Sequence, residues 1–316
     1  MKWLKKLWAK ITGKNQAQKS QQPNQSQSQK EDKPYFDITP TPKPAPVVNQ
    51  PDTSEPDWFE WCKTAMIESG RFEGKGTDWA NVVPNFDGAI LTCGLLGFTW
   101  KWNNQAPMVL KFIERHGIEY FMKLMPKSGG EYRRACILGE SKGKHIILTF
   151  SNSKTVFEPY KKELTALWGS EEMKAIQVET SVTMFGNFAK KQCLAGQEFF
   201  GMPRPTFHHY RYWFDQAVLN GTSKTVTFDR HDDISNASIL SWCESASGYT
   251  TKDLKANVKL WREALKTAGP DKQALWRMAY LRAQNSRTEF KPVTMNRRGT
   301  LALGVGMVNG SKRVLS

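Results

Sequence analysis

Apolar residues are spaced along the chain in different ways, and the spacing divides it into three segments. Residues 1–14 place two tryptophans, two leucines and an isoleucine on one helical face, with lysines around the rest. Residues 15–56 are rich in Gln, Ser, Pro and Asn and hold too little apolar surface to fold. The pattern therefore predicts an amphipathic cationic helix, a disordered linker, and a folded domain over residues 57–316.

Within the folded domain most segments have helical spacing. The segment "DWFEWCKTAMIESG" predicts a helix with Asp57 as N-cap and Gly70 as its stop, which places Glu68 in the last turn. "APMVLKFIERHG" predicts an amphipathic helix that ends at Gly117. Four further helices are predicted in "SVTMFGNFAKKQCLAGQEFF", "TFHHYRYWFDQAVLNG", "TKDLKANVKLWREALKTAG" and "DKQALWRMAYLRAQNS".

Two segments have a different character. "AILTCGLLGFTW" is apolar with Thr and Gly interruptions, which indicates a strand or hairpin followed by a helix start. "RRACILGESKGKHIILTFSN" is rich in β-branched residues and is interpreted as a second hairpin. No segment reaches the roughly 20 apolar residues of a membrane span. The expected fold class is α+β, predominantly α-helical, with a small sheet in the first third of the domain.

The net charge of the chain indicates which classes of partner it attracts. The chain has 45 Lys and Arg against 30 Asp and Glu, a formal net charge of +15, which favours a polyanion such as nucleic acid, anionic lipid or anionic cell wall. Five cysteines form no CxxC pair and no metal-ligand spacing, so reduced, buried thiols are expected. His208 and His209 also lack the separation of a metal site, and a solvated or interfacial role is expected for them. We expect no metal and no cofactor.

The N-terminal helix of residues 1–14 has tryptophans and lysines arranged for the interface of an anionic membrane. It lacks the continuous apolar stretch and the small-residue cleavage site of a signal peptide. We therefore expect synthesis in the cytoplasm without an export signal.

Two acidic residues flank the glycine-rich stretch at the start of the domain. Cleavage of a glycosidic bond needs a proton donor for the leaving oxygen and a carboxylate opposite it. Glu68, after "CKTAMI" at a helix end, is expected to be partly desolvated and protonated, whereas Asp87, on a loop before Gly88, is expected to stay ionised. Because the chain has 30 acidic residues, this pair alone does not identify an active site.

The segment "DGAILTCGLLGF", residues 87–98, resembles the corresponding segment of family-46 glycoside hydrolases, the chitosanases with a lysozyme-like fold. In that family Asp-Gly is followed at fixed spacing by Thr and by Gly-aliphatic-aliphatic-Gly-Phe. This sequence matches in register, without a gap, at Asp87, Gly88, Thr92, Gly94, Gly97 and Phe98. Glu68 falls where the family has its acid, and Glu68-Ser69 also resembles the Glu-Ser of goose-type lysozymes and lytic transglycosylases. The resemblance implies a two-lobed domain with a small sheet beside the cleft.

Two later segments extend the resemblance. "YWFDQAVLNG" resembles the family's aromatic-aromatic-Asp-x-x-Val-x-x-Gly helix, which implies that Asp215 is its buried aspartate. "NSRTEF" resembles the family's Ser-Arg before an acidic residue, which implies that Arg287 ties the catalytic Glu to that aspartate. A second arginine is expected beside Asp215, and the candidates are Arg262, Arg277 and Arg282.

By this resemblance Glu68 is the general acid, Asp87 is the general base, and Thr92 helps to position the attacking water. The implied outcome is inversion, with the two carboxyl groups roughly 6.5 to 9.5 Å apart. Glu73 is an alternative acid, because it keeps a short spacing to Asp78-Trp79 that the family shares.

Trp100 and Trp102 lie beside the expected site, where they either stack on sugar rings or pack in the core.

The substrate is a separate question. Where the chitosanases continue Asp-Gly-Arg-Gly, this sequence has Asp87-Gly88-Ala89-Ile90. Chitosan is a polycation that a strongly basic protein repels, whereas peptidoglycan with its anionic polymers attracts it. We therefore expect an enzyme that cuts the glycan of peptidoglycan, of the phage endolysin or antibacterial effector type, acting at the cell wall after release or delivery. A chitosanase, and a non-enzymatic nucleic-acid- or membrane-binding protein, are the alternatives; no specific nucleic acid is expected as a partner.

Overall fold

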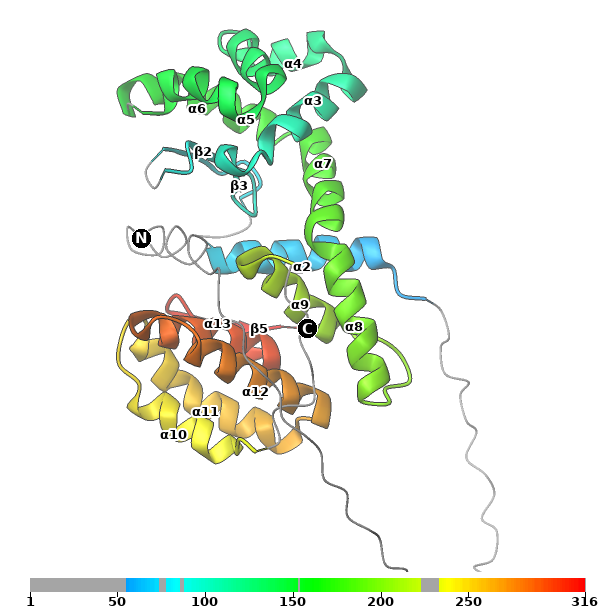
Figure 1. Ribbon diagram of the computed structural model, residues 1–316, viewed down its shortest axis with the longest axis vertical. Helices are drawn as coiled ribbons and strands as arrows, with labels where there is room; N and C mark the ends of the chain where they lie inside the picture. Colours follow the sequence, from blue (N-terminus) through cyan, green and yellow to red (C-terminus); the bar gives the residue numbers. More distant parts are fainter. Residues whose placement is uncertain (1–54, 74–77, 86–87, 153, 223–232, 316) are drawn as a thin grey trace, which may run out of the picture.

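The computed structural model describes residues 55–73, 78–85, 88–152, 154–222 and 233–315. Figure 1 shows two lobes joined by helices that run between them. The predicted N-terminal helix of residues 1–14 and nearly all of the predicted linker of residues 15–56 lie outside the described residues.

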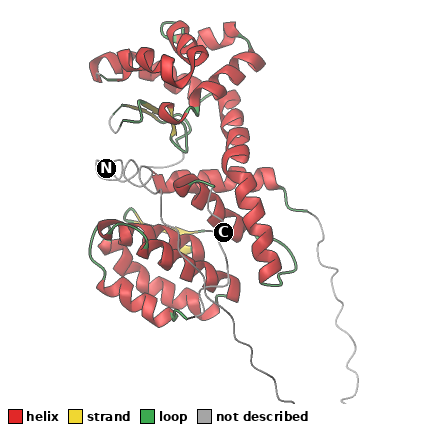
Figure 2. Ribbon diagram, viewed as in Figure 1, coloured by secondary structure: helices red, strands yellow, loops and turns green. Residues whose placement is uncertain are grey.

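The described chain is built mainly from helices, with five short strands among the described residues (Figure 2). The helices are α2 (Trp58–Glu73), α3 (Gln105–His116), α4 (Ile118–Leu124), α5 (Gly129–Ser151), α6 (Lys154–Trp168), α7 (Glu171–Ser181), α8 (Asn187–Phe199), α9 (Phe207–Asn220), α10 (Asn236–Ser245), α11 (Thr251–Thr267), α12 (Pro270–Gln284) and α13 (Lys291–Leu303). Short helical turns are η1 (Trp100–Trp102), η2 (Val182–Gly186) and η3 (Thr288–Phe290). The strands are β1 (Val82–Pro84), β2 (Leu91–Cys93), β3 (Phe98–Thr99), β4 (Val305–Val308) and β5 (Ser311–Val314). The predicted α+β class, predominantly α-helical with a small sheet, is confirmed.

The lobes differ in their elements. One lobe contains α3 to α6 with the antiparallel sheet β1-β2-β3, and the other contains α10 to α13 with the hairpin β4-β5. The elements α7, η2 and α8 connect them in one nearly continuous helical run, with α2 and α9 packed together at the middle of the molecule (Figure 1). The candidate acid Glu68 lies on α2, between the two lobes.

The helix α2 begins as the sequence predicts and ends later. The Asp57 carboxylate accepts from the backbone N–H of Phe59 and of Glu60, both at 3.1 Å, so Asp57 is the N-cap. Gly70 does not stop the helix, which continues to Glu73. A Cβ on Gly70 would lie 2.5 Å from Leu95 Cδ1, so the glycine lets the turn of the β2-β3 hairpin pack directly on α2. Glu68 is therefore inside the helix and close to that hairpin.

The second predicted hairpin, in "RRACILGESKGKHIILTFSN", is wrong: the segment forms α5. Its buried residues include Tyr132, Ala135, Cys136, Gly143 and Ile147, and this spacing is that of one helical face. A break at Gly139, with φ 75° and ψ −179°, interrupts the helix and hides its period in the sequence. Of the β-branched residues in this segment Ile147 is buried in the core, whereas Ile137 is 58% exposed.

The β1-β2-β3 sheet is held by polar side chains from the helices around it. Gln105 donates to the carbonyls of Leu91 and Phe98, at 3.0 and 2.7 Å, and accepts from the Tyr132 hydroxyl at 3.1 Å. Gln177 on α7 accepts from the Leu95 backbone N–H at 3.1 Å. Because each buried carbonyl or N–H is paired, the sheet has a defined place against the helices.

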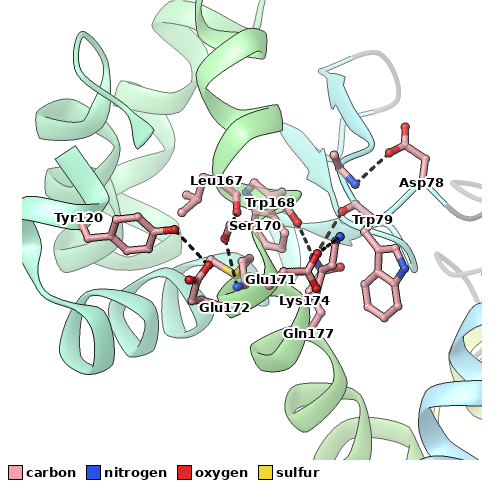
Figure 3. A network of polar contacts seen from close by, with 12 residues as sticks. Asp78, Trp79, Tyr120, Leu167, Trp168, Ser170, Glu171, Glu172, Lys174 and Gln177 are labelled. Atoms are coloured by element: carbon pink, nitrogen blue, oxygen red, sulfur yellow. Dashed lines mark hydrogen bonds and ion pairs between the residues drawn. The ribbon is translucent and has the colours of Figure 1, made fainter. Parts of the chain in front are cut away.

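Gln177 also fastens the chain that leads into the sheet. Its amide nitrogen donates to the carbonyls of Trp168 at 2.9 Å and of Trp79 at 3.4 Å (Figure 3). Ser170 caps α7 by accepting from the Met173 N–H at 3.2 Å. The start of α7 is thereby a common anchor for the sheet and for the helices of that lobe.

All five cysteines are buried free thiols, as predicted. No helix in the part of the chain that the structure describes is long and apolar enough to cross a membrane.

Candidate active site

Glu68 lies near the middle of the molecule with almost no solvent contact. Its residue exposure is 6%, and its helix packs against α9. Arg211 on α9 donates from one guanidinium nitrogen to Glu68 Oε2 at 3.3 Å. The carboxyl group is therefore buried but held beside a buried cation.

A second buried carboxylate, that of Asp215, lies on α9 one turn after Arg211. Asp215 is fully buried and forms ion pairs with Arg297 and Arg298, two consecutive residues of α13. The Arg297 guanidinium donates to both carboxylate oxygens, with contacts from 2.5 to 3.1 Å, and Arg298 lies 3.1 Å from Oδ2. This bidentate pairing joins α9 to α13 close enough to Glu68 for the charge of Asp215 to act on it.

The two carboxyl groups differ in their proton affinity because their cations differ. Burial raises the pKa of Glu68, and the nearby charge of Asp215 adds to this, while Arg211 opposes it without cancelling it. Burial also pushes the pKa of Asp215 upward, but Arg297 and Arg298 outweigh it and leave that pKa below its ordinary value. Glu68 thus tends to keep its proton while Asp215 stays ionised.

Arg211 has a further partner on its own helix. Its second terminal nitrogen lies 2.9 Å from His208 Nδ1, and His208 Nε2 lies 2.7 Å from the Ala302 carbonyl of α13. The expectation of a solvated or interfacial role for the histidines is therefore wrong. His208 is part of the polar network behind Glu68, and His209 is fully buried with its ring 3.5 Å from Asp271.

The prediction that Arg287 pairs with Asp215 is wrong. Arg287 is exposed at the turn before η3, and the cations at Asp215 are Arg297 and Arg298, ten residues further along. Arg287 precedes α13, whereas Arg297 and the fully buried Arg298 lie within that helix.

The alternative arginines are not the partners of Asp215 either. Arg262 is exposed and pairs with Glu244, and Arg282 donates to the side chain of Asn220. Arg277 lies on α12, where it has contacts of its own. The predicted cation pair around Asp215 exists, but the residues that form it are later in the chain.

Asp87, the candidate base, lies outside the described residues, and so does the side chain of the alternative acid Glu73. The chain on both sides of residues 86–87 is described and anchored. Asn85 donates from its side chain to Asn152 at 2.9 Å and accepts from the Ile90 backbone N–H at 3.1 Å. Asn85 therefore links the described residues that precede and follow positions 86–87.

The motif residues of the hairpin have the backbone geometry that their types require. The three motif glycines, Gly88, Gly94 and Gly97, have φ values of 82°, 80° and 69°. Ile90 has φ 73°, although β-branched residues rarely adopt such values. This turn therefore holds a β-branched residue at a cost in backbone strain.

Thr92 lies in β2, half-buried, with Val83 and Thr99 as its cross-strand neighbours. Its role beside an attacking water stays a prediction.

The two candidate aromatic platforms separate clearly. Trp100 is 1% exposed, packs on Tyr132 and donates its indole N–H to the Glu140 carbonyl at 3.1 Å, so it is a core residue and does not reach a sugar. Trp102 is 51% exposed, with the Lys101 ammonium 5.5 Å from its ring. Only Trp102 of the two is placed for stacking on a ligand.

No cluster of metal-ligating side chains occurs among the residues that the structure describes.

Sequence reasoning missed His208, Arg211, Arg297 and Arg298. The signal for the first two was present, because residues 208, 211 and 215 share one face of a helix. Arg297 and Arg298 gave no such signal, since an "RR" pair in a basic C-terminal segment resembles a surface charge cluster.

No family model matches the sequence, and no curated protein is significantly similar to it. Two solved structures of a chitosanase from Bacillus subtilis MY002 are similar in shape. One is a mutant complexed with 6 GlcN, with a TM-score of 0.45 and 14% identity, and the other is the native enzyme, with 0.44 and 13%. Each match covers 83% of this chain and 100% of that chain. A likeness of this size leaves the function to be inferred from the side chains of this protein.

Proposed function

We propose that the protein is a glycoside hydrolase that cuts the glycan strands of bacterial peptidoglycan, with Glu68 as general acid and Asp87 as general base. The observation that carries the proposal is the state of Glu68. It is a buried carboxyl group with a raised pKa, and it accepts a hydrogen bond from Arg211. Its helix, α2, packs against the β2-β3 hairpin. A raised pKa favours the protonated form of the carboxyl group, and this form can protonate the leaving oxygen of a glycosidic bond.

Asp215 and its two arginines support the role of Glu68 as the acid. Its fixed negative charge favours the protonated form of Glu68, and the ion pairs with α13 hold that charge in place. Asp215 itself is fully buried and neutralised, so it is a positioning group rather than a second reacting carboxylate.

The identity of the base rests on the motif. Asp87 aligns with the family's Asp-Gly, and Asn85, two residues earlier, is hydrogen-bonded to Asn152 and Ile90. An inverting reaction is proposed from this pairing, with a water activated by Asp87 near Thr92.

The choice of polymer rests on charge. A protein with a net charge of +15 is attracted to an anionic cell wall and repelled by polycationic chitosan. Chitosan is kept as the second candidate because the "DGAILTCGLLGF" segment resembles that of chitosanases.

Delivery to the wall is part of the same proposal. The amphipathic cationic segment of residues 1–14 is proposed to bind an anionic membrane surface, and the enzyme is proposed to reach the wall by release or delivery.

The test is digestion of purified murein sacculi, and separately of chitosan, with products identified by mass spectrometry. Wild-type protein is expected to release muropeptides with new reducing ends, whereas products lighter by one water would indicate transglycosylase chemistry. Glu68→Gln is expected to lower the rate by at least about 100-fold, because general acid catalysis contributes that much.

Two matched variants complete the test. Glu60→Gln changes an exposed glutamate on the same helix and is expected to keep full activity. Glu73→Gln tests the alternative acid, and an inactive Glu73 variant beside an active Glu68 variant would transfer the role. Release of chitosan oligomers alone would replace the substrate, and no cleavage of either polymer would favour a binding protein.

A further inference from the structure

Two contacts of the Arg211 guanidinium group bear on the candidate acid. One terminal nitrogen donates to Glu68 Oε2 at 3.3 Å, and the other donates to His208 Nδ1 at 2.9 Å. His208 and Arg211 are three residues apart on α9, a spacing that brings side chains together on one helix face. The contact to the carboxylate is the longer of the two, although both have the same cationic donor.

The protonation of His208 follows from these contacts. An arginine has only donors, so His208 Nδ1 accepts, and the ring proton lies on Nε2. Nε2 then donates to the Ala302 carbonyl at 2.7 Å, which fixes the ring against α13. Burial lowers the pKa of His208 to about 3, with the charge of Arg211 as the next cause, so the ring is neutral throughout the working pH range.

The orientation of Arg211 matters for Glu68. A guanidinium fork commonly binds a carboxylate with two nitrogens, and such a pairing stabilises the ionised form and lowers the carboxyl pKa. With its second nitrogen directed to His208, Arg211 presents one nitrogen to Glu68 Oε2. This arrangement keeps a cation beside Glu68 while leaving burial as the dominant influence on its proton.

Other charges face these groups. Around Glu68 they are Arg71 on its own helix and Asp215 on α9. Around His208 they are Lys272 on α12 and the neighbouring His209. None of them shares the hydrogen bond between His208 and Arg211, so substitution of His208 acts on Glu68 through Arg211.

We propose that His208 is a positioning residue for the acid: by accepting from Arg211, it restrains the guanidinium from binding Glu68 with two nitrogens and so lets Glu68 keep its proton. The inference deepens the proposed function and rests on it, in that Glu68 is taken as the general acid.

The test uses two substitutions in the full chain. His208→Leu removes the acceptor at similar volume, and His208→Asn keeps an acceptor oxygen near the position of Nδ1. The pKa of Glu68 is measured by carboxyl ¹³C NMR titration of protein labelled at glutamate, with the resonance assigned by its loss in Glu68→Gln. His208→Leu is expected to lower the Glu68 pKa by about one unit, because Arg211 then pairs with it more fully. His208→Asn is expected to keep it near the wild-type value.

The pH dependence of kcat is expected to shift in the same direction as the pKa of Glu68. On the polymer that the wild type cuts, the alkaline limb of the kcat profile is expected to move to lower pH in His208→Leu, with KM unchanged. A role limited to packing would lower the rate without moving the limb. His145→Leu, which changes an exposed histidine in the other lobe, is the matched control and leaves the pKa of Glu68 unchanged.

An unchanged or raised Glu68 pKa in His208→Leu, or an equal shift in His208→Asn, would overturn the inference. If His208→Leu does not fold, His208→Met takes its place with the same expectation. If the wild type cuts neither polymer, the proposed function fails, while the NMR titration still decides the role of His208.

Discussion

At the scale of single residues, the site depends on how many cations each buried carboxyl group has. Asp215 has two arginines and stays ionised in a fully buried position, because their attraction outweighs the cost of burial. Glu68 has Arg211, which also contacts His208, and the weaker influence of Arg71, and burial prevails over both. The pKa values of these two acids on neighbouring helices are therefore shifted in opposite directions.

The raised pKa of Glu68 predicts that this residue lowers stability at neutral pH. Since its folded-state pKa lies above the unfolded value, the folded chain holds more protons between the two, and stability falls as pH rises through that window. Glu68→Gln removes the ionisation, so it is expected to be more stable than wild type near pH 7.5 and to match it below about pH 4, where the carboxyl group is protonated in both states. Urea unfolding across this pH range measures the difference.

Glu60→Gln is the control for that experiment, because its exposed carboxylate lies in a solvated pair with Lys63. A Glu68→Gln variant that is less stable than wild type at neutral pH would show that the Arg211 ion pair outweighs burial.

At the scale of elements, the sheet is short and depends on buried side chains from the helices. Its strands are two or three residues long, and such strands are not stable by themselves. Gln105, fully buried on α3, supplies two hydrogen bonds to strand carbonyls and accepts a third from Tyr132. The position of Thr92 therefore depends strongly on Gln105, while Gln177 holds the turn of the hairpin at Leu95.

Gln105→Met keeps the volume but leaves two strand carbonyls and a buried hydroxyl without their partner. The variant is expected to lose about 2 to 4 kcal/mol of unfolding free energy, since each unpaired buried group costs about 1 to 3 kcal/mol. Urea denaturation measures the loss. Tyr132→Phe removes only one of the three bonds and is expected to cost about 1 kcal/mol; equal losses in the two variants would contradict the view that Gln105 holds the strands.

At the scale of the whole molecule, the basic side chains lie in two kinds of place. Arg211, Arg297 and Arg298 form buried contacts with carboxylates, and most of the remaining basic side chains lie at the surface. The basic C-terminal segment thus contributes part of its charge to the inside of the protein, through Arg298.

The surface charge predicts a dependence of activity on salt. If the substrate is an anionic wall polymer, kcat/KM is expected to fall by about tenfold between about 0.02 M and 0.3 M salt, because screening removes the attraction that raises the association rate. Turbidity of a cell-wall suspension follows the rate. A rise with salt would instead indicate a cationic polymer such as chitosan, since screening then removes repulsion, and a constant rate would contradict the role assigned to the net charge.

The sequence by itself determined the helical class, the Asp57 cap, the β2-β3 hairpin and the burial of the cysteines. These features follow from local spacing, capping residues and glycine conformations, which act over a few neighbouring residues. Local spacing failed for α5, because a break at Gly139 divides one helical face into two short pieces.

Only the tertiary structure decided which cations surround the acids. Arg297 and Arg298 reach Asp215 across 82 and 83 residues of chain, and Arg211 reaches Glu68 across 143. It likewise decided that Trp100 is buried while Trp102 is exposed, although the two lie two residues apart in one short turn. The reason is that burial and ion pairing depend on which helices pack together, and no local pattern of residues records that packing.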